Sequence, residues 1–123
     1  MQERRRFVRL PVAWKLSYRL VGTGPSAQSL ASISKDTSSG GIAFFTHSLL
    51  APRTIVKLQF QVPGHPRPID CTVQVAWSGP LLREYATQHD IGFEAGVRFI
   101  EIASEDQRVL LQYLAAVTPP ATP

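Results

Sequence analysis

Apolar and polar residues alternate strictly in several short stretches of this 123-residue chain, and this period of two constrains its fold most. Every second residue from Val12 to Leu20 is apolar, and the pattern recurs over residues 56–62 and 71–77. Such alternation predicts β-strands that turn one face toward a core. Clusters of Gly, Pro and Ser separate the stretches and indicate turns. The chain is therefore predicted to be an all-β protein.

Three further stretches are expected to be extended. Residues 28–35 form a weaker, Ser-rich strand, and residues 42–46 resume extended sequence after a turn. Residues 92–102 form the last strand, in which the apolar phase slips by one residue between Phe99 and Ile100. A slip of this kind predicts a β-bulge, because side chains in a strand alternate between its two faces.

One helix is expected near the C-terminus. Ser104 and Gln107 have the spacing of a capping box, and Pro119 follows the helical pattern and would end it. The apolar stripe between these signals consists of Val109, Leu110, Tyr113, Leu114 and Val117. Short antiparallel strands with a single helix favour a small closed barrel, since closure leaves no exposed strand edge.

The two tryptophans are predicted to lie in the core of this barrel. Trp14 falls in the same strand phase as Leu16, and Trp77 falls in the same phase as Val75. Both phases point inward if the alternation continues without interruption.

The net charge of +4 is distributed unevenly. Residues 1–9 hold four arginines and one glutamate, which is a net charge of +3, so the rest of the chain contributes only +1. We therefore expect a basic arm over residues 1–10, a barrel with its helix over residues 11–117, and a disordered tail over residues 118–123. The nearly neutral body argues against a nucleic-acid-binding face there.

Composition and motifs exclude several classes of function. A hydrophobic content of 44% with 18% charged residues is typical of a folded soluble protein, and no apolar run has the roughly 20 residues of a membrane span. The single cysteine, Cys71, fits a cytoplasmic protein without disulfides. Three scattered histidines predict no metal site, and no nucleophile elbow or phosphate-binding loop is present. We expect neither an enzyme nor a cofactor.

Two short segments carry the chemistry that remains. Arg5 and Arg9 lie four residues apart in a run of basic residues, and a guanidinium group binds phosphate oxygens or the edge of guanine through two hydrogen bonds. Downstream, Asp36 offers a carboxylate and Ser38 a hydroxyl. These groups together predict a site for an anionic ligand that also carries hydrogen-bond donors, as a guanine nucleotide does.

Glycines and an aromatic residue accompany the second segment. Gly40 and Gly41 are expected to let the backbone bend and approach a ligand. Phe45 falls on the outer face of its strand, where it would either stack on a purine or lie under the helix or a loop. Asp36 and Ser38 also have a purely structural interpretation, because both residue types bond their own backbone in turns.

The order and spacing of the two segments resemble the signature of PilZ domains, which are bacterial receptors for cyclic di-GMP. The resemblance rests on RxxxR, which is Arg5 to Arg9, and on DxSxxG, which is Asp36, Ser38 and Gly41. It extends over residues 4–116. It implies a six-stranded antiparallel β-barrel with one C-terminal helix, and a non-enzymatic protein of the cytoplasm.

The resemblance also implies roles for individual residues. The arginines would clamp phosphates and guanine faces, and the second segment would hydrogen-bond a guanine edge. Arg4, directly before the pair, implies binding of two intercalated cyclic di-GMP molecules, whose phosphates repel one another unless cations lie near them. The predicted ligand-binding residues are Arg4, Arg5, Arg9, Asp36, Ser38, Gly40, Gly41 and Phe45.

On this reading the basic arm orders over the barrel when ligand binds and so signals to a downstream protein in motility, biofilm or exopolysaccharide control. Two other functions stay open at this point. One is a PilZ-type adaptor that binds no nucleotide and docks on pilus or motility machinery. The other is a small barrel that binds nucleic acid through its basic arm. The nearly neutral body argues against this alternative.

Overall fold

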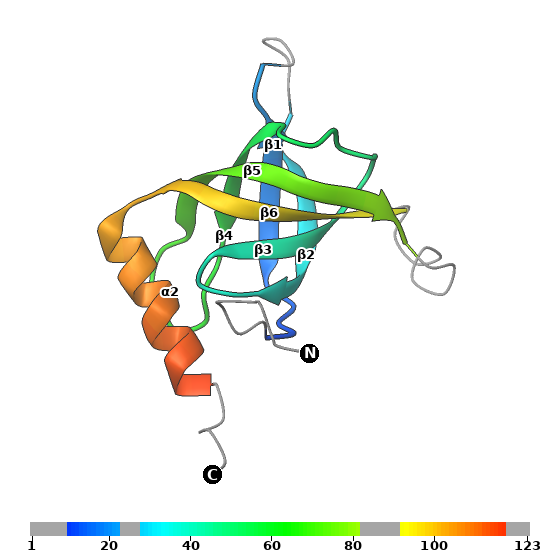
Figure 1. The fold of residues 1–123 in the computed structure, drawn as a ribbon. Coiled ribbons are helices and arrows are strands. Elements are labelled where there is room, and N and C mark those ends of the chain that lie inside the picture. Colours follow the sequence, from blue (N-terminus) through cyan, green and yellow to red (C-terminus); the bar gives the residue numbers. More distant parts are fainter. Residues whose placement is uncertain (1–9, 23–27, 82–91, 118–123) are drawn as a thin grey trace, which may run out of the picture.

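The computed structural model describes residues 10–22, 28–81 and 92–117, which contain six strands and a helix (Figure 1). The elements are β1 (Lys15–Leu20), β2 (Leu30–Thr37), β3 (Gly41–Thr46), β4 (Ile55–Phe60), β5 (Ile69–Pro80), β6 (Phe93–Ile102) and α2 (Ser104–Val117). The strands pair antiparallel in the order β1-β2-β3-β6-β5-β4, and β4 also pairs with β1, so the sheet closes into a barrel. The predicted all-β class, six-stranded barrel and C-terminal helix are confirmed.

The core consists of the alternating apolar side chains that predicted the strands. In β1, Leu16 and Tyr18 are buried, whereas the residues between and beside them are exposed or half-buried. Trp14, just before β1, stacks on Phe60 with ring centroids 5.7 Å apart and meets the ring of Tyr113 of α2 at 5.4 Å. Trp14 is therefore a core residue, as predicted, and it joins the helix to the barrel interior.

The bulge predicted in the last strand is present. The pairing of β5 with β6 passes from Thr72–Glu101 directly to Val73–Phe99, so Ile100 has no partner in this ladder. The extra residue changes the face to which later side chains point, and Ile100 itself is 47% exposed. The phase slip in the sequence thus located this irregularity correctly.

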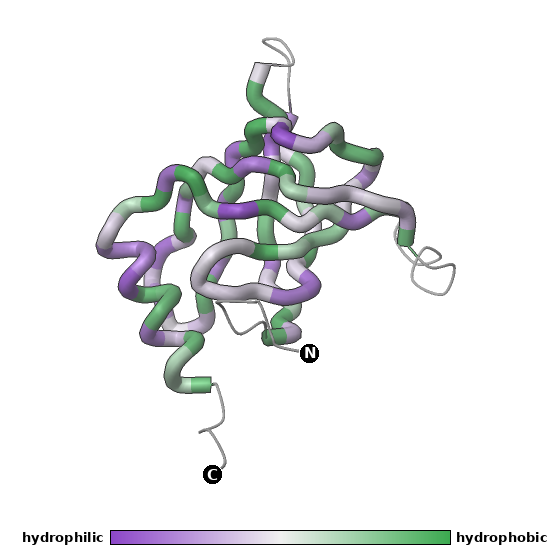
Figure 2. Tube along the Cα trace, viewed as in Figure 1, coloured by the Kyte–Doolittle hydropathy of each residue, from purple (hydrophilic) through white to green (hydrophobic). Residues whose placement is uncertain are grey.

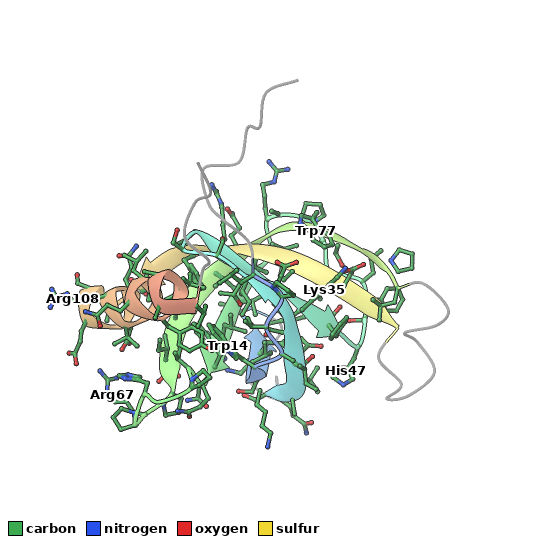
Figure 3. All side chains as sticks on the ribbon, turned by 90° about the horizontal axis from the view of Figure 1, so that it is seen from below. Trp14, Lys35, His47, Arg67, Trp77 and Arg108 are labelled. Carbon is green, nitrogen blue, oxygen red and sulfur yellow. The ribbon has the colours of Figure 1, made fainter. Side chains whose placement is uncertain are left out.

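A second irregularity in the same ladder overturns the prediction for Trp77. Val75 pairs with Val97, but Trp77 pairs with the preceding residue of β6, Gly96, so Ala76 is the extra residue. This shift turns Trp77 out of the phase of Val75. Its side chain is 44% exposed on the outer face, and Figure 3 shows it outside the barrel while Trp14 lies within. The assignment of Trp77 to the core is wrong.

The helix begins at Ser104 and ends at Val117, in agreement with the capping box and the prolines that follow. Alternating hydrophobic and hydrophilic bands along α2 in Figure 2 reflect its amphipathic sequence. Leu110 and Leu114 are buried against the barrel. Val117, which the predicted stripe included, is 45% exposed, because the contact with the barrel ends one turn earlier.

An ion pair fastens the first turn of α2 to the connection between β4 and β5. Arg67 Nη2 lies 3.3 Å from Asp106 Oδ1 and 3.5 Å from Glu105 Oε1. The side chain of Asp106 is only 5% exposed, so its carboxylate is held away from water and beside a guanidinium. This contact and the apolar stripe together fix the position of the helix.

No helix among the described residues is long and apolar enough to cross a membrane. The predicted arm over residues 1–10 lies outside the described residues except for Leu10, and the predicted tail lies wholly outside them. Their boundaries stay predictions.

The burial of Cys71 generates a prediction about stability at alkaline pH. Burial and, after it, the nearby carboxylates of Asp70 and Asp106 raise the pKa of its thiol to about 12, against a smaller lowering effect of the Lys57 ammonium group. In the unfolded chain the thiol ionises near its ordinary pKa of 9.0. Between these values the folded state keeps a proton that the unfolded state loses, so the free energy of unfolding should fall as pH rises from 9 toward 12, by up to about 1.4 kcal/mol per pH unit.

Urea denaturation at several pH values measures this slope. A Cys71→Val variant keeps an apolar side chain of similar size but has no thiol, so its slope should be shallower. Identical slopes for the two proteins would contradict the assignment to Cys71.

Candidate functional site

The second motif forms the hairpin between β2 and β3. The backbone N–H of Ser38 donates to the carbonyl of Gly41 at 2.9 Å, so only Ser39 and Gly40 connect the paired residues. The carbonyl of Gly40 accepts a hydrogen bond from the N–H of Phe99 in β6 at 3.1 Å. The hairpin is therefore fastened to a third strand and holds the motif in a fixed place.

The start of the described chain joins the barrel at this same hairpin. Leu10 and Thr37 form an antiparallel bridge in which each N–H donates to the other's carbonyl at 2.9 Å. Thr37 lies between Asp36 and Ser38, and Leu10 follows Arg9 in the sequence. The structure thus brings the residue that follows the first motif to the middle of the second. The predicted ligand-binding residues Arg4, Arg5 and Arg9 themselves lie outside the described residues.

Asp36 is half-buried on the outer face of the barrel. The register of β2 against β3 shifts between Ser34 and Asp36, and Asp36 pairs with Ala43. Ala43 lies between Ile42 and Phe44, whose side chains are fully buried inside the barrel. Since side chains alternate along a strand, Ala43 and its partner Asp36 face outward. Asp36 therefore lies on the outer face, and its contact with a ligand stays a prediction.

The hydroxyl of Ser38 is occupied within the hairpin. The residue is 2% exposed. Its Oγ accepts a hydrogen bond from the N–H of Gly40 at 3.3 Å and donates one to the carbonyl of Gly41 at 3.4 Å. This geometry matches the structural interpretation of Ser38 as a turn residue. Ser38 shapes the backbone around which a ligand would bind.

Gly41 is required by packing and not by backbone conformation. Among the described residues, positive φ angles at glycine occur only at Gly22 and Gly64, so the conformational freedom expected of Gly40 and Gly41 is not used. A Cβ at Gly41 would instead lie 2.2 Å from the carbonyl oxygen of Val97. The close approach seen at Gly41 is to β6, and the predicted approach to a ligand stays a prediction.

Phe45 is half-buried on the same outer face as Asp36. It follows Ala43 by two residues in β3 and pairs with Glu94 of β6. Glu94 also forms an ion pair with Lys35, with Oε1 and Nζ 2.8 Å apart. The outward phase predicted for Phe45 is confirmed, and its contact with a ligand stays a prediction.

Neighbouring outward residues of β5 and β6 extend this surface, and sequence analysis did not assign them to the site. Arg98 pairs with Gly41 and donates from Nε, at 3.0 Å, and from Nη2, at 2.5 Å, to Oε1 of Gln74. In the next row, Trp77 lies against Gly96. The sequence gives only weak signals for these two residues. Arg98 is one outward charge among several, and the place of Trp77 depends on Gly96, a glycine inside a strand.

One cleft of the described chain lies beside this face. A cleft of about 690 Å³ separates the hairpin from α2, with Gly40, Ile100 and Leu111 among its lining residues. Another of about 610 Å³ lies over β1, β4 and β5, and Asp36 is not among its lining residues. Within the described ranges, no three His, Cys, Asp or Glu side chains gather closely enough to hold a metal ion.

Comparison with known proteins identifies what the chain is similar to. The family model of the PilZ domain matches residues 3–116. No curated protein matches the sequence significantly.

Solved structures share this fold at low sequence identity. The inhibitor of motility MotI/DgrA of Bacillus subtilis has a TM-score of 0.74 at 22% identity, covering 94% of this chain and 51% of that one. The PilZ domain of YcgR from Escherichia coli with c-di-GMP has a TM-score of 0.68 at 13% identity, covering 94% and 92%. The MrkH–c-di-GMP complex of K. pneumonia has a TM-score of 0.69 at 17% identity, covering 95% and 52%. The chain thus spans about half the length of MotI/DgrA and MrkH.

The environment of Gly41 generates a prediction about stability. Gly41→Ala should lower the melting temperature, because its Cβ would lie 2.2 Å from the backbone of Val97 and the two strands would have to separate. Overpacking of this kind costs about 1–3 kcal/mol. Gly79→Ala is the matched control in β5, since a Cβ there meets nothing within 4 Å. Equal melting temperatures for the two variants, measured by circular dichroism, would contradict the packing role of Gly41.

Proposed function

The chain belongs to the PilZ domain family, and from this premise we propose that it is a receptor for cyclic di-GMP. The matched residues include both motifs. Two solved structures of the same fold, those of YcgR and MrkH, contain c-di-GMP. A non-enzymatic role follows from the family, whose members act by binding the dinucleotide.

The bridge between Leu10 and Thr37 is the observation that carries this proposal. Consecutive Cα atoms lie about 3.8 Å apart, so Arg9 is tethered next to a residue that pairs with the centre of the second motif. In this proposal the guanidinium of Arg9 and the carboxylate of Asp36 bind the same ligand. Cyclic di-GMP offers a phosphate to the first and the N–H groups of guanine to the second.

The remaining site residues have distinct roles in this proposal. Arg5 acts with Arg9 on phosphates and guanine faces. The backbone of Gly40 and Gly41 forms the rim on which the ligand lies, in the conformation that Ser38 stabilises from below. Phe45 provides apolar surface beside this rim.

Arg4 extends the positive charge of the clamp, and we assign to it a role in binding two intercalated ligands. Two stacked molecules bring four phosphates together, and their mutual repulsion falls when several arginines lie nearby. The stoichiometry of a calorimetric titration with cyclic di-GMP distinguishes one bound ligand from two. We expect two ligands per chain.

Ligand binding would fix residues 1–9 over the outer face of the barrel and so change the surface that a downstream protein meets. This is a disorder-to-order switch of a segment. Such a receptor would act as an adaptor in the control of motility, biofilm or exopolysaccharide.

Removing either arginine of the pair should nearly abolish binding. Arg5→Ala and Arg9→Ala each delete a charge-assisted contact, which lowers affinity on the order of a hundredfold. Isothermal titration with cyclic di-GMP measures this loss, and Arg19→Ala removes an exposed arginine of β1 as the matched control. Unchanged affinity in both arm variants would show that the arm is not the clamp. Tight binding of single-stranded DNA by the parent would favour the nucleic-acid alternative.

Asp36 should determine selectivity for guanine. In the parent, cyclic di-GMP should bind more tightly than cyclic di-AMP, because adenine lacks the N1–H and N2–H₂ donors that a carboxylate accepts. Asp36→Ala should reduce this preference, whereas Asp70→Ala, which removes an exposed carboxylate from β5, should leave it intact. Competition binding with both dinucleotides provides the measurement. Equal affinity of the parent for the two ligands would refute the guanine-edge role.

A further inference from the structure

The cleft between the β2–β3 hairpin and α2 has an exposed apolar lining. Phe99, Ile100 and Ile102 of β6 and Leu111 of α2 contribute to it, and its volume is about 690 Å³. Ile100 is 47% exposed and Leu111 is 46% exposed, although Leu110, the helix residue before it, is fully buried. Figure 1 shows the hairpin beside the helix. An exposed apolar surface within a cleft is typical of a place where another segment or molecule binds.

The bridge at the start of the described chain points toward this cleft. Leu10 and Thr37 pair antiparallel, so the chain before Leu10 and the chain after Thr37 leave the bridge in the same direction. The residues that follow Thr37 are Ser38, Ser39 and Gly40, and the last two of these line the cleft. The basic arm therefore has the hairpin end of the cleft directly on its way.

The residues of the arm nearest to Leu10 suit the lining of the cleft. Phe7 and Val8 precede Leu10 by three and two residues, so the Cα atom of Phe7 lies within about 11 Å of it. Arg6 comes directly before them and could meet the carboxylate of Glu101, which also lines the cleft. The segment 118–123 contains only Thr, Pro and Ala, so it offers no comparable apolar side chain. Among the terminal segments, the arm is the better match.

Resting on the proposed function, we propose that this cleft is the docking site of residues 6–8 when the arm orders on its ligand. Phe7 and Val8 cover the exposed side chains of Ile100 and Leu111, and Arg6 lies toward the acidic side of the lining. The arm is then held by an apolar contact in addition to its contacts with the dinucleotide.

Docking and ligand binding support each other because they order the same segment. Arg5 precedes Phe7 by two residues and Arg9 follows it by two, so the apolar anchor lies midway between the two arginines of the clamp. Ordering the arm costs conformational entropy, and burial of apolar surface in the cleft offsets part of this cost. The docked segment also joins the ligand site to α2. The surface that a downstream protein meets then includes the helix.

Calorimetry with cyclic di-GMP tests the contribution of the cleft to affinity. Leu111→Ser removes an exposed apolar side chain from the lining and should weaken binding about tenfold. Phe7→Ser changes the other side of the contact, precedes the first strand and should show the same loss. Leu49→Ser is the matched control, because Leu49 is 59% exposed in the loop after β3 and does not line the cleft. Its affinity should equal that of the parent.

Nuclear magnetic resonance tests the contact itself in the unmodified chain. In the complex with cyclic di-GMP, the ring protons of Phe7 should show nuclear Overhauser contacts to the methyl groups of Leu111 and Ile100. The methyl groups of Leu49 should show none. Melting curves of the variants without ligand show whether the barrel is intact, and Phe7→Ser carries the affinity test if Leu111→Ser does not fold.

The outcomes separate the docking site from the receptor. Absence of binding by the parent overturns the receptor proposal and the coupled docking with it. Binding by the parent that Leu111→Ser and Phe7→Ser leave unchanged, without contacts from the ring of Phe7, overturns the docking alone. A parent that sediments as a dimer, with Leu111→Ser a monomer of unchanged affinity, would assign the cleft to a second copy of the chain and overturn the docking of the arm.

Discussion

The ladder between β3 and β6 is the interaction on which the rest of the arrangement depends. These strands are far apart in the sequence, and their pairing runs from Gly41–Arg98 to Thr46–Phe93. It closes the barrel and places the hairpin of the second motif beside the outward residues of β5 and β6. Two glycines make the fit possible: Gly41 allows the backbone of Val97 to approach, and Gly96 leaves room for the indole. Without this ladder, Asp36 and Trp77 would not share a surface.

The features of the fold that depend on neighbouring residues in the sequence could be predicted, and those that depend on pairing between distant segments could not. The strand that contains Leu16 and Tyr18 was evident because each side chain needs only its own phase to be placed. The bulge at Ile100 was also evident, since the apolar phase slips there in the sequence. The bulge at Ala76 leaves no such trace, because the sequence keeps alternating up to Trp77. Only the register against β6 places that residue outside.

The candidate site likewise contains residues that the sequence identifies by itself and residues that only the structure brings together. Asp36 and Ser38 could be found from their own spacing, yet only the structure shows that one faces outward and the other is buried in the turn. Arg98 with Gln74, and Trp77 with Gly96, depend on pairings between distant segments, which no local pattern encodes. The arginines of the first motif lie outside the described residues, and the structure places only Leu10, which follows them. Part of the second motif thus stabilises its own hairpin, through the hydroxyl of Ser38 and the missing side chain of Gly41.

The ion pair at the start of α2 has an evolutionary consequence. Asp106 is buried, so a chain that lost Arg67 would keep a carboxylate away from water with only the ring of His65, 4.0 Å from Oδ1, beside it, which is destabilising. A chain that replaced both residues by apolar ones would avoid this cost. Positions 67 and 106 are therefore constrained to change together. In related chains, the residues at positions 67 and 106 should therefore be both charged or both apolar, and seldom one of each.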